Sequence, residues 1–270
     1  MDFKLPERKQ NSHKGTFGKV LNIAGSRYMP GAAYLSSVSA LKIGCGYCFL
    51  ASEESVINAV SAQTQNVVFL PYKDIKKQIP DVISIGCGLT TSHKAQVIFR
   101  EVINHFKGTP LIIDADGLNI LSKMNIVLSD KTILTPHYKE ASRLLDADLK
   151  EISNNPEKYA KEISKKYNCI TVLKGHKTII TDTKGQVYID NTGNSALAKA
   201  GSGDVLTGMI AGLVAQGMDM FEAAKLGVYL HGKCGELAAQ KLTEYSVMAE
   251  DLISYIPYAI KNYLPKNSCN

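Results

Sequence analysis

Short apolar runs alternate along the chain with longer segments in which apolar residues recur at helical spacing. The short runs predict buried strands, and the longer segments predict helices that bury one face. Strands are predicted at 19–24, 47–51, 66–70, 82–85, 110–114, 131–135 and 169–173, and helices at 31–43, 91–106, 136–145, 155–167, 204–216, 220–242 and 248–260. Segments 177–181 and 186–190 are predicted to form a hairpin around Asp182-Thr183-Lys184-Gly185.

This alternation, followed by a short antiparallel segment and terminal helices, predicts an α/β protein. The expected architecture is a three-layer α/β/α sandwich with a mostly parallel central sheet. In such sheets, ligands bind beyond the carboxyl ends of the strands. The chain has 270 residues, 45% of them hydrophobic, which is enough for one large core. Because no stretch rich in proline, serine or glycine marks a linker, a single domain spanning residues 1–270 is expected.

The charge and composition exclude some classes of partner. The net charge is +6, but lysines are scattered among acidic residues, so no nucleic-acid partner is expected. A polyanionic small molecule such as a nucleotide suits this mild positive charge. No apolar run approaches the roughly 20 residues that span a bilayer, and residues 1–19 are polar and basic. The expectation is therefore a soluble, cytoplasmic protein without a membrane partner.

The six cysteines are spread along the chain. Cys45 and Cys48 form a Cys-x-x-Cys, but no second pair lies at zinc-finger spacing. Because Cys48 lies in an apolar run, core packing is expected rather than a redox or metal role.

The segment Gly201-Ser202-Gly203-Asp204 precedes a long uncharged run, 205–215, whose apolar residues have helical spacing. Glycines before a helix leave backbone N–H groups free to face an anion, and the helix dipole adds positive potential there. A carboxylate in the first helical turn would lie beside a bound phosphate, where it could prepare a hydroxyl for attack. Alternatively, Asp204 is only an N-cap, worth about 1 kcal/mol.

Two acidic residues, Asp114 and Asp116, lie at the end of the buried strand 110–114. They could hold Mg2+ through water or hydrogen-bond a sugar. The alternative is that Asp116 caps the next helix.

Polar or glycine-rich segments also follow other predicted strands. Thr135-Pro136 gives an N-cap and first-turn signal for a helix. His137 could then donate a hydrogen bond to substrate and Glu140 could orient metal-bound water. Alternatively, His137 is an ordinary surface residue and Glu140 complements the helix dipole. Lys174-Gly175-His176-Lys177-Thr178 offers cations and N–H groups to a nucleotide, or forms a solvated turn. Small residues at 24–26 and 30–33 permit either close approach of a ligand or tight helix-on-sheet packing. Gly86-Cys87-Gly88-Leu89 either admits a ligand in the same way or forms a turn. No P-loop and no dinucleotide fingerprint is present.

Several of these motifs together resemble the NAD(P)H-hydrate dehydratases of the ribokinase-like superfamily. The resemblance rests on Asn191-Thr192-Gly193-Asn194, Ala200-Gly201-Ser202-Gly203-Asp204-Val205-Leu206-Thr207-Gly208, Asp114-Ala115-Asp116, Thr135-Pro136-His137 and Lys174-Gly175, in the same order along the chain. It implies a ribokinase-like fold and repair of hydrated NADH and NADPH. The terminal phosphoryl group of ADP or ATP would be transferred to the ring hydroxyl, and elimination of phosphate would restore the double bond.

The resemblance also implies roles for individual residues. Asp204 would be the base at the hydroxyl, and the N–H groups of Gly201, Ser202 and Gly203 would stabilise the transferring group. Nucleotide contacts are implied for Lys174, Gly175, His176, Lys177, Thr178 and Gly203, and hydrate contacts for Ala33, Gly88, His137 and Asp204. Mg2+ would bridge the phosphates, with its protein ligands left open. A homotetramer and a separate NAD(P)H-hydrate epimerase are further implications.

Two alternatives remain at this level. The first is a small-molecule kinase of the hydroxyethylthiazole-kinase type, and the second is a non-catalytic nucleotide-binding protein. Related sugar kinases carry Asn-x-x-Glu where this chain has His137-Tyr138-Lys139-Glu140. That difference disfavours a sugar kinase and leaves the role of Glu140 at a metal open.

Overall fold

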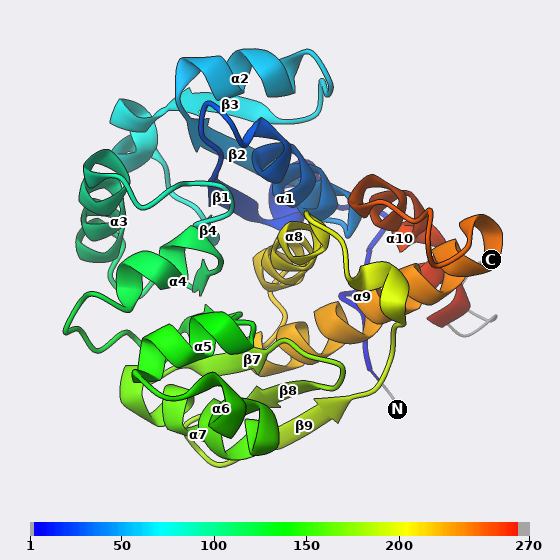
Figure 1. Ribbon diagram of the computed structural model, residues 1–270. Helices are drawn as coiled ribbons and strands as arrows, with labels where there is room; N and C mark the ends of the chain where they lie inside the picture. The colour runs from blue at the N-terminus through cyan, green and yellow to red at the C-terminus, as the bar shows by residue number, and fades with distance from the viewer. Residues whose placement is uncertain (1–2, 264–270) are drawn as a thin grey trace.

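The computed structural model describes residues 3–263, so Cys269 lies outside the described residues. Within this range the strands form one sheet in the order β3-β2-β1-β4-β5-β6-β7-β8-β9 (Figure 1). Strands β1 to β7 are parallel, and β8 and β9 extend the sheet as an antiparallel hairpin. The strands are β1 (Lys19–Ile23), β2 (Tyr47–Ser52), β3 (Val68–Pro71), β4 (Val82–Ile85), β5 (Leu111–Ile113), β6 (Thr132–Leu134), β7 (Ile170–Leu173), β8 (Thr178–Thr181) and β9 (Val187–Asp190).

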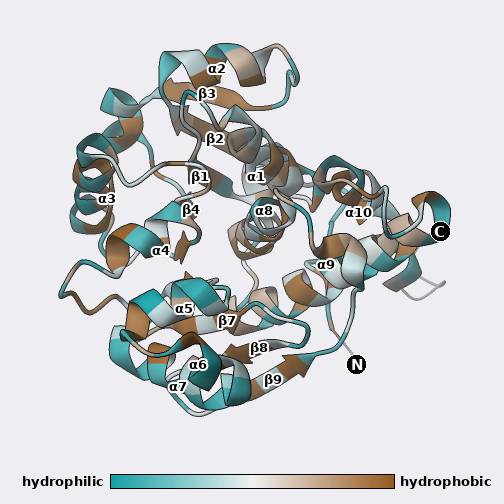
Figure 2. Cartoon of the chain, in the orientation of Figure 1, coloured by the Kyte–Doolittle hydropathy of each residue, from teal (hydrophilic) through white to brown (hydrophobic). Residues whose placement is uncertain are grey.

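Helices cover both faces of the sheet and make the predicted three-layer sandwich. One face packs against α1 (Pro30–Lys42), α8 (Ser202–Ala215), α9 (Met220–Leu242) and α10 (Ala249–Tyr263). The other packs against α3 (His93–His105), α4 (Asp116–Leu121), α5 (Tyr138–Leu145), α6 (Leu149–Asn154) and α7 (Pro156–Tyr167). Helix α2 (Glu54–Ser61) covers the β2–β3 end of the sheet with a smaller apolar cluster. The strands are apolar, whereas α2, α5 and α7 carry polar residues on their outer faces (Figure 2).

The short helices differ most from the expectation. Helices α2, α4 and α6 were not predicted, because segments of eight, six and six residues carry too few turns for a clear period. The 3-10 helices η1 (Lys14–Phe17), η2 (Tyr72–Lys77) and η3 (Ser195–Leu197) were missed for the same reason.

The predicted N-cap of helix α5 is wrong. Thr135 and Pro136 lie before the helix, and His137 is the N-cap. The Lys174 N–H donates to the Pro136 carbonyl (2.8 Å), and His137 forms a parallel bridge with Lys174. Pairing with the β7 end therefore delays the start of the helix by two residues.

Helices α1 and α8 touch through their backbones. A Cβ atom at Gly208 would lie 2.1 Å from the Ser36 carbonyl oxygen, and one at Gly212 would lie 2.6 Å from that of Ala40. Figure 1 shows α8 near the middle of the molecule, beside α1 and α9. The glycines in the apolar run therefore set how closely α8 approaches α1.

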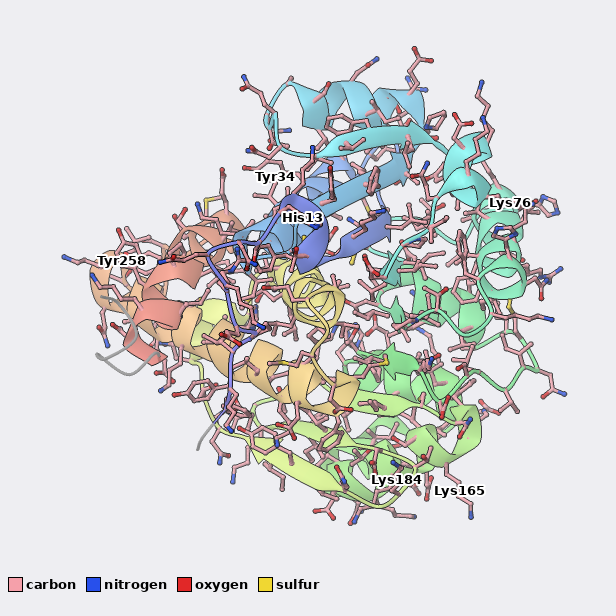
Figure 3. The ribbon with its side chains drawn as sticks, turned by 180° about the vertical axis from the view of Figure 1, so that it is seen from behind. His13, Tyr34, Lys76, Lys165, Lys184 and Tyr258 are labelled. Carbon is pink, nitrogen blue, oxygen red and sulfur yellow. The ribbon has the colours of Figure 1, made fainter. Side chains whose placement is uncertain are left out.

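The N-terminal segment crosses the back of the molecule beside α9 (Figure 3). Its Phe3 ring lies 5.6 Å from the Tyr229 ring of α9, and the Arg8 guanidinium lies 4.0 Å from the centre of the Phe17 ring. This segment ties the start of the chain to the helical layer. Among the described helices, none combines the length and apolar character needed to cross a membrane.

A glycine after β4 is required by both its backbone conformation and its surroundings. Gly86 has φ of +125°, and a Cβ there would lie 2.0 Å from the Asp114 carbonyl oxygen and 2.6 Å from the Gly117 nitrogen. Both contacts are backbone atoms, which cannot rotate away. The loop after β4 therefore packs directly on the loop after β5.

We expect Gly86→Ala to lower the free energy of unfolding by about 3 kcal/mol or more, because it adds a backbone clash to conformational strain. Gly108→Ala is the matched control: Gly108 has φ of +84° but nothing within 4 Å of its Cβ position. The control should lose only about 1 kcal/mol. Urea unfolding measures both, and equal losses would contradict the close approach.

Candidate functional site

A largely buried ion pair joins the ends of β5 and β7 at the carboxyl edge of the sheet, and a hydrogen bond connects it to α8. The Lys174 ammonium, after β7, lies 2.7 Å from Asp114 Oδ1, after β5. The other oxygen, Oδ2, accepts a hydrogen bond from Thr207 Oγ1 of α8 (2.7 Å). Asp114 is only 1% exposed. Its environment therefore supplies a cation and a hydroxyl in place of water.

The ion pair decides the charge of Asp114. Burial by itself would raise the pKa of this carboxyl, but the charge and hydrogen bond of Lys174 and the hydroxyls of Thr207 and Thr135 hold the pKa below its ordinary value. Burial lowers the pKa of Lys174, and Asp114 and Glu140 more than offset this, so the net shift is upward. Both groups therefore stay charged at neutral pH.

Asp204 is in the first turn of α8 but is not its N-cap. Gly201, with φ of +90°, occupies the cap position, and Asp204 is the third helical residue. The interpretation of Asp204 as an N-cap is therefore wrong. Burial and then the charge of Asp114 raise the pKa of Asp204 to about 7, against the lowering effects of the Cys87 thiol hydrogen bond and the Lys174 charge. Such a carboxylate can accept a proton near neutral pH.

The start of α8 lies against the ion pair. A Cβ at Gly203 would be 3.4 Å from Lys174 Nζ and 3.8 Å from Asp114 Oδ2. The Ser202 N–H donates to the Lys199 carbonyl (3.2 Å), so it takes part in the turn before the helix. The structure thus brings Lys174, Gly203 and Asp204 together, as the N-terminus of a buried helix beside a cation. This is a suitable place for a phosphate.

Two further residues of the predicted nucleotide segment, His176 and Lys177, line a separate pocket of about 520 Å3. The β7–β8 turn contributes His176 and Lys177 to it, and Ile179 and Ile189 form an apolar side. The rest of the lining comes from Tyr138, Asn154, Asn155, Pro156, Glu157 and Lys158. A Cβ at Gly175 would lie 2.5 Å from the Tyr138 hydroxyl, so Gly175 lets this ring lie over the turn, while Thr178 begins β8.

His137 and Glu140 form a capping box at the start of α5. The Glu140 N–H donates to His137 Nδ1 (3.2 Å), and the His137 N–H donates to Glu140 Oε2 (2.8 Å). Burial raises the pKa of Glu140 to about 7; the charge of Lys174 opposes this, and that of Asp114 adds to it. Burial and the charge of Lys174 lower the pKa of His137. The His137 side chain remains 49% exposed, and its Nε2 lies 3.5 Å from Glu140 Oε1.

Asp116 has a different environment from Asp114. Its Oδ2 accepts from the Thr90 N–H (2.8 Å), and Ala115, with φ of +48°, is the N-cap of α4. The expectation that Asp116 caps this helix is therefore wrong, because Asp116 is the first helical residue and its side chain reaches back to the loop after β4. Asp116 joins two loops at the edge of the site.

Ala33 and Gly88 come from adjacent segments. The Gly25 N–H donates to the Cys87 carbonyl (2.8 Å), and a Cβ at Gly25 would lie 2.9 Å from Ala33 Cβ. Gly88 packs closely on Ala32. Among the described residues, Ser26 Oγ is the buried side-chain polar atom for which no hydrogen-bond partner is present. Its hydroxyl is therefore available to a ligand between these loops.

The described residues include no group of three or more His, Cys, Asp or Glu side chains arranged to hold a metal ion. Asp114 is paired with Lys174, and Glu140 is engaged in the capping box. Cys45 and Cys48 are buried in the core, and burial raises the pKa of both thiols, that of Cys48 to about 12. The expectation of core packing for Cys48 agrees with this position.

Three residues of the site were not identified from the sequence. Thr207 bonds Asp114, the Cys87 thiol bonds Asp204, and His231 of α9 bonds Ser202. Thr207 is a hydroxyl residue in a run of apolar side chains, and that signal could have identified it. The other two depend on contacts between distant segments.

The sheet order, the helix N-terminus and the paired charges define an α/β protein of the ribokinase-like class. The profile of the NAD(P)H-hydrate dehydratases matches residues 20–258. The chain belongs to this family.

Individual relatives agree with this assignment. An ADP-dependent (S)-NAD(P)H-hydrate dehydratase from Bacillus subtilis is 34% identical over 96% of this chain and 95% of the relative. A crystal structure of the ADP/ATP-dependent NAD(P)H-hydrate dehydratase from Bacillus subtilis, co-crystallised with ATP and Mg2+, superposes with a TM-score of 0.89 at 33% identity, covering 96% of this chain and 95% of that one. The bifunctional NAD(P)H-hydrate repair enzyme Nnr of Moorella thermoacetica is 35% identical over 96% of this chain but only 52% of its own length. The chain thus spans about half the length of such bifunctional relatives.

The raised pKa of Asp204 predicts a pH-dependent effect on stability. An unfolded Asp loses its proton near pH 4, whereas Asp204 in the fold loses it near pH 7. Between these values the folded state binds more protons, so this residue makes folding less favourable as pH rises. We expect Asp204→Asn to be more stabilising at pH 8 than at pH 4.5, by about 1–3 kcal/mol.

Urea unfolding of both proteins at the two pH values measures this difference. Glu162→Gln is the control, because its carboxylate is 45% exposed on α7, and it should give a much smaller change. A pH-independent effect of Asp204→Asn would contradict the raised pKa.

Proposed function

We propose that this chain catalyses nucleotide-dependent dehydration of the S-epimer of hydrated NADH and NADPH, with ADP as the donor. The terminal phosphoryl group would pass to the ring hydroxyl, releasing AMP. Loss of phosphate and of a ring proton would then restore the double bond and yield NAD(P)H. The observation that carries the proposal is Asp204, whose pKa is about 7, in the first turn of a helix that faces the Lys174 charge.

In this proposal Asp204 accepts the proton of the substrate hydroxyl. Its raised pKa makes it a stronger base than an ordinary carboxylate, while it remains largely ionised just above neutral pH. The N–H groups at the start of α8, with Gly203 closest to Lys174, would stabilise charge on the transferring group. Lys174 is held in place by Asp114, and it adds positive charge at the same point.

The pocket beside the β7–β8 turn is a suitable place for the nucleoside. Its apolar side, formed by Ile179 and Ile189, can pack against a base, while His176 and Lys177 supply donors. The turn that lines this pocket begins at Lys174, so one segment can contact both the nucleoside and the phosphates.

We place the hydrate between the loops after β1 and β4 and the start of α5. Ala33 and Gly88 allow close approach, His137 has a half-exposed imidazole, and Ser26 has a buried hydroxyl available for a polar group. This places the substrate hydroxyl toward Asp204, which the Cys87 thiol contacts from the β4 loop.

Mg2+ would enter with the nucleotide, held by phosphate oxygens and water. The paired state of Asp114 and the absence of a preformed cluster in residues 3–263 favour this over an all-protein site. A homotetramer and a separate epimerase that interconverts the hydrate epimers complete the proposal. The bifunctional NAD(P)H-hydrate repair enzymes among the relatives are consistent with a second repair activity that accompanies this one.

The function is tested by incubating the purified protein with hydrated NADH and Mg2+, with ADP, with ATP or without nucleotide. Recovery of reduced-nicotinamide absorbance together with release of phosphate is expected with ADP. A phosphorylated hydrate that stays intact would instead indicate a kinase. Nucleotide binding without turnover would indicate the non-catalytic alternative.

The pH dependence of turnover provides a second test. We expect kcat/KM to rise with pH and level off above about 7, because Asp204 must be ionised to accept the hydroxyl proton. Asp204→Asn should lower kcat by at least about 100-fold while ADP still binds. A profile unchanged between pH 5 and 8, or full turnover by the variant, would refute the assigned role.

The nucleoside pocket is tested on strand β9. Ile189→Trp should fill the pocket and raise KM for ADP by about tenfold or more, with KM for the hydrate within about threefold. Val187→Trp is the control, because Val187 is similarly exposed on the same strand but outside the pocket lining. Equal effects of the two substitutions on KM for ADP would rule out this location.

A further inference from the structure

A buried histidine of α9 bonds the first residue of α8. His231 is 7% exposed, and its Nε2 lies 2.9 Å from the Ser202 carbonyl oxygen and 3.1 Å from Ser202 Oγ. A carbonyl oxygen can only accept a hydrogen bond, so Nε2 carries the hydrogen and donates. Burial lowers the pKa of His231 to about 4, and the Lys174 charge also lowers it, so the ring is neutral at physiological pH. Its single N–H is therefore the one that faces Ser202.

The acceptor belongs to the peptide unit that also carries the Gly203 N–H. A hydrogen bond to a carbonyl oxygen draws electron density toward that oxygen and makes the N–H of the same unit a better donor. It also fixes the plane of the peptide, and with it the direction of the N–H. Gly203 is the helix residue that lies against Lys174, where the transferring phosphoryl group is placed above.

The position of His231 along α9 is fixed by close contacts with the segment Asn191–Asn194. A Cβ at Gly232 would lie 2.0 Å from Thr192 Oγ1, which donates its hydrogen to Asp190 Oδ2 (2.5 Å) and lies 3.3 Å from the Tyr229 carbonyl oxygen. The Gly193 N–H donates to Glu236 Oε1 (2.9 Å). This segment therefore clamps α9 on both sides of His231 and sets the distance from Nε2 to Ser202.

We propose that His231 is a positioning residue, whose Nε2–H orients and polarises the Ser202–Gly203 peptide so that the Gly203 N–H binds the terminal phosphoryl group of the nucleotide. The proposal rests on the proposed function. The Asn191–Asn194 segment acts one step further away, by holding the helix that carries His231. A purely structural role would make His231 one of many buried hydrogen bonds that stabilise the packing of α8 on α9.

Two substitutions separate these roles. His231→Gln can place an amide N–H where Nε2 lies, whereas His231→Leu fills a similar volume without a donor. Val228→Ala is the control for stability, because it truncates a buried apolar residue on the same helix without altering the bond to Ser202. All three variants are compared with the unmodified chain in thermal unfolding, steady-state kinetics and calorimetric binding of ADP and AMP.

The informative quantity is the ratio of the dissociation constants of AMP and ADP, because only ADP carries the phosphate that Gly203 would contact. We expect His231→Leu to shrink this ratio at least about fivefold and to lower kcat about 10- to 100-fold. His231→Gln should keep both within about threefold, and Val228→Ala should lower the melting temperature while leaving both unchanged. The proposal would be overturned if His231→Leu left the ratio and kcat unchanged. It would also be overturned if Val228→Ala lowered the ratio and kcat as much as His231→Leu does. Because the binding ratio needs no turnover, it tests His231 even if the hydrate proves not to be the substrate.

Discussion

The buried pair of Lys174 and Asp114 is the interaction on which the rest of the site depends. It joins the ends of two strands, β5 and β7, and Thr207 extends it to α8. Removing one partner from such a pair costs about 3–5 kcal/mol, because the other charge is left buried without compensation. Burial raises the pKa of Asp204 and of Glu140, and the same two charges adjust both values, Asp114 upward and Lys174 downward. One ion pair thus serves the fold and the chemistry together.

Much of the fold could be predicted from the sequence, since the sheet is made of short runs that are apolar on both faces. The runs around Val82–Ile85 and Ile170–Leu173 are fully buried, and such strands have few alternatives. Segments whose conformation depends on tertiary contacts were harder to predict from the sequence. Pro136 stays outside the helix because its carbonyl accepts a hydrogen bond from Lys174, which is far away in the sequence. Local preference at Thr135-Pro136 favours a helix start, and strand pairing overrides it.

For the site, the sequence predicted which segments lie together at the carboxyl edge of the sheet. It did not predict which of their side chains form ion pairs and hydrogen bonds. The acidic strand end at Asp114 and the glycines before Asp204 were visible as motifs. The partner of Asp114 lies 60 residues away in Lys174 and 93 away in Thr207, and no local pattern encodes those choices. His231 lies in a helical segment whose apolar spacing predicts only packing against the core. Its contact with Ser202 follows from how α9 is clamped, which only the assembled molecule shows.

The contact between the backbones of α1 and α8 has a consequence for movement during a catalytic cycle. With the Ser36 and Ala40 carbonyls pressed against Gly208 and Gly212, α8 can neither slide nor roll without separating the two helices. If the proposed function holds, conformational adjustment on binding would then be confined to the surface loops and to the nucleotide, because the start of α8 cannot move. Selection for a longer polyphosphate donor would accordingly change those loops, while the helix pair stays constant.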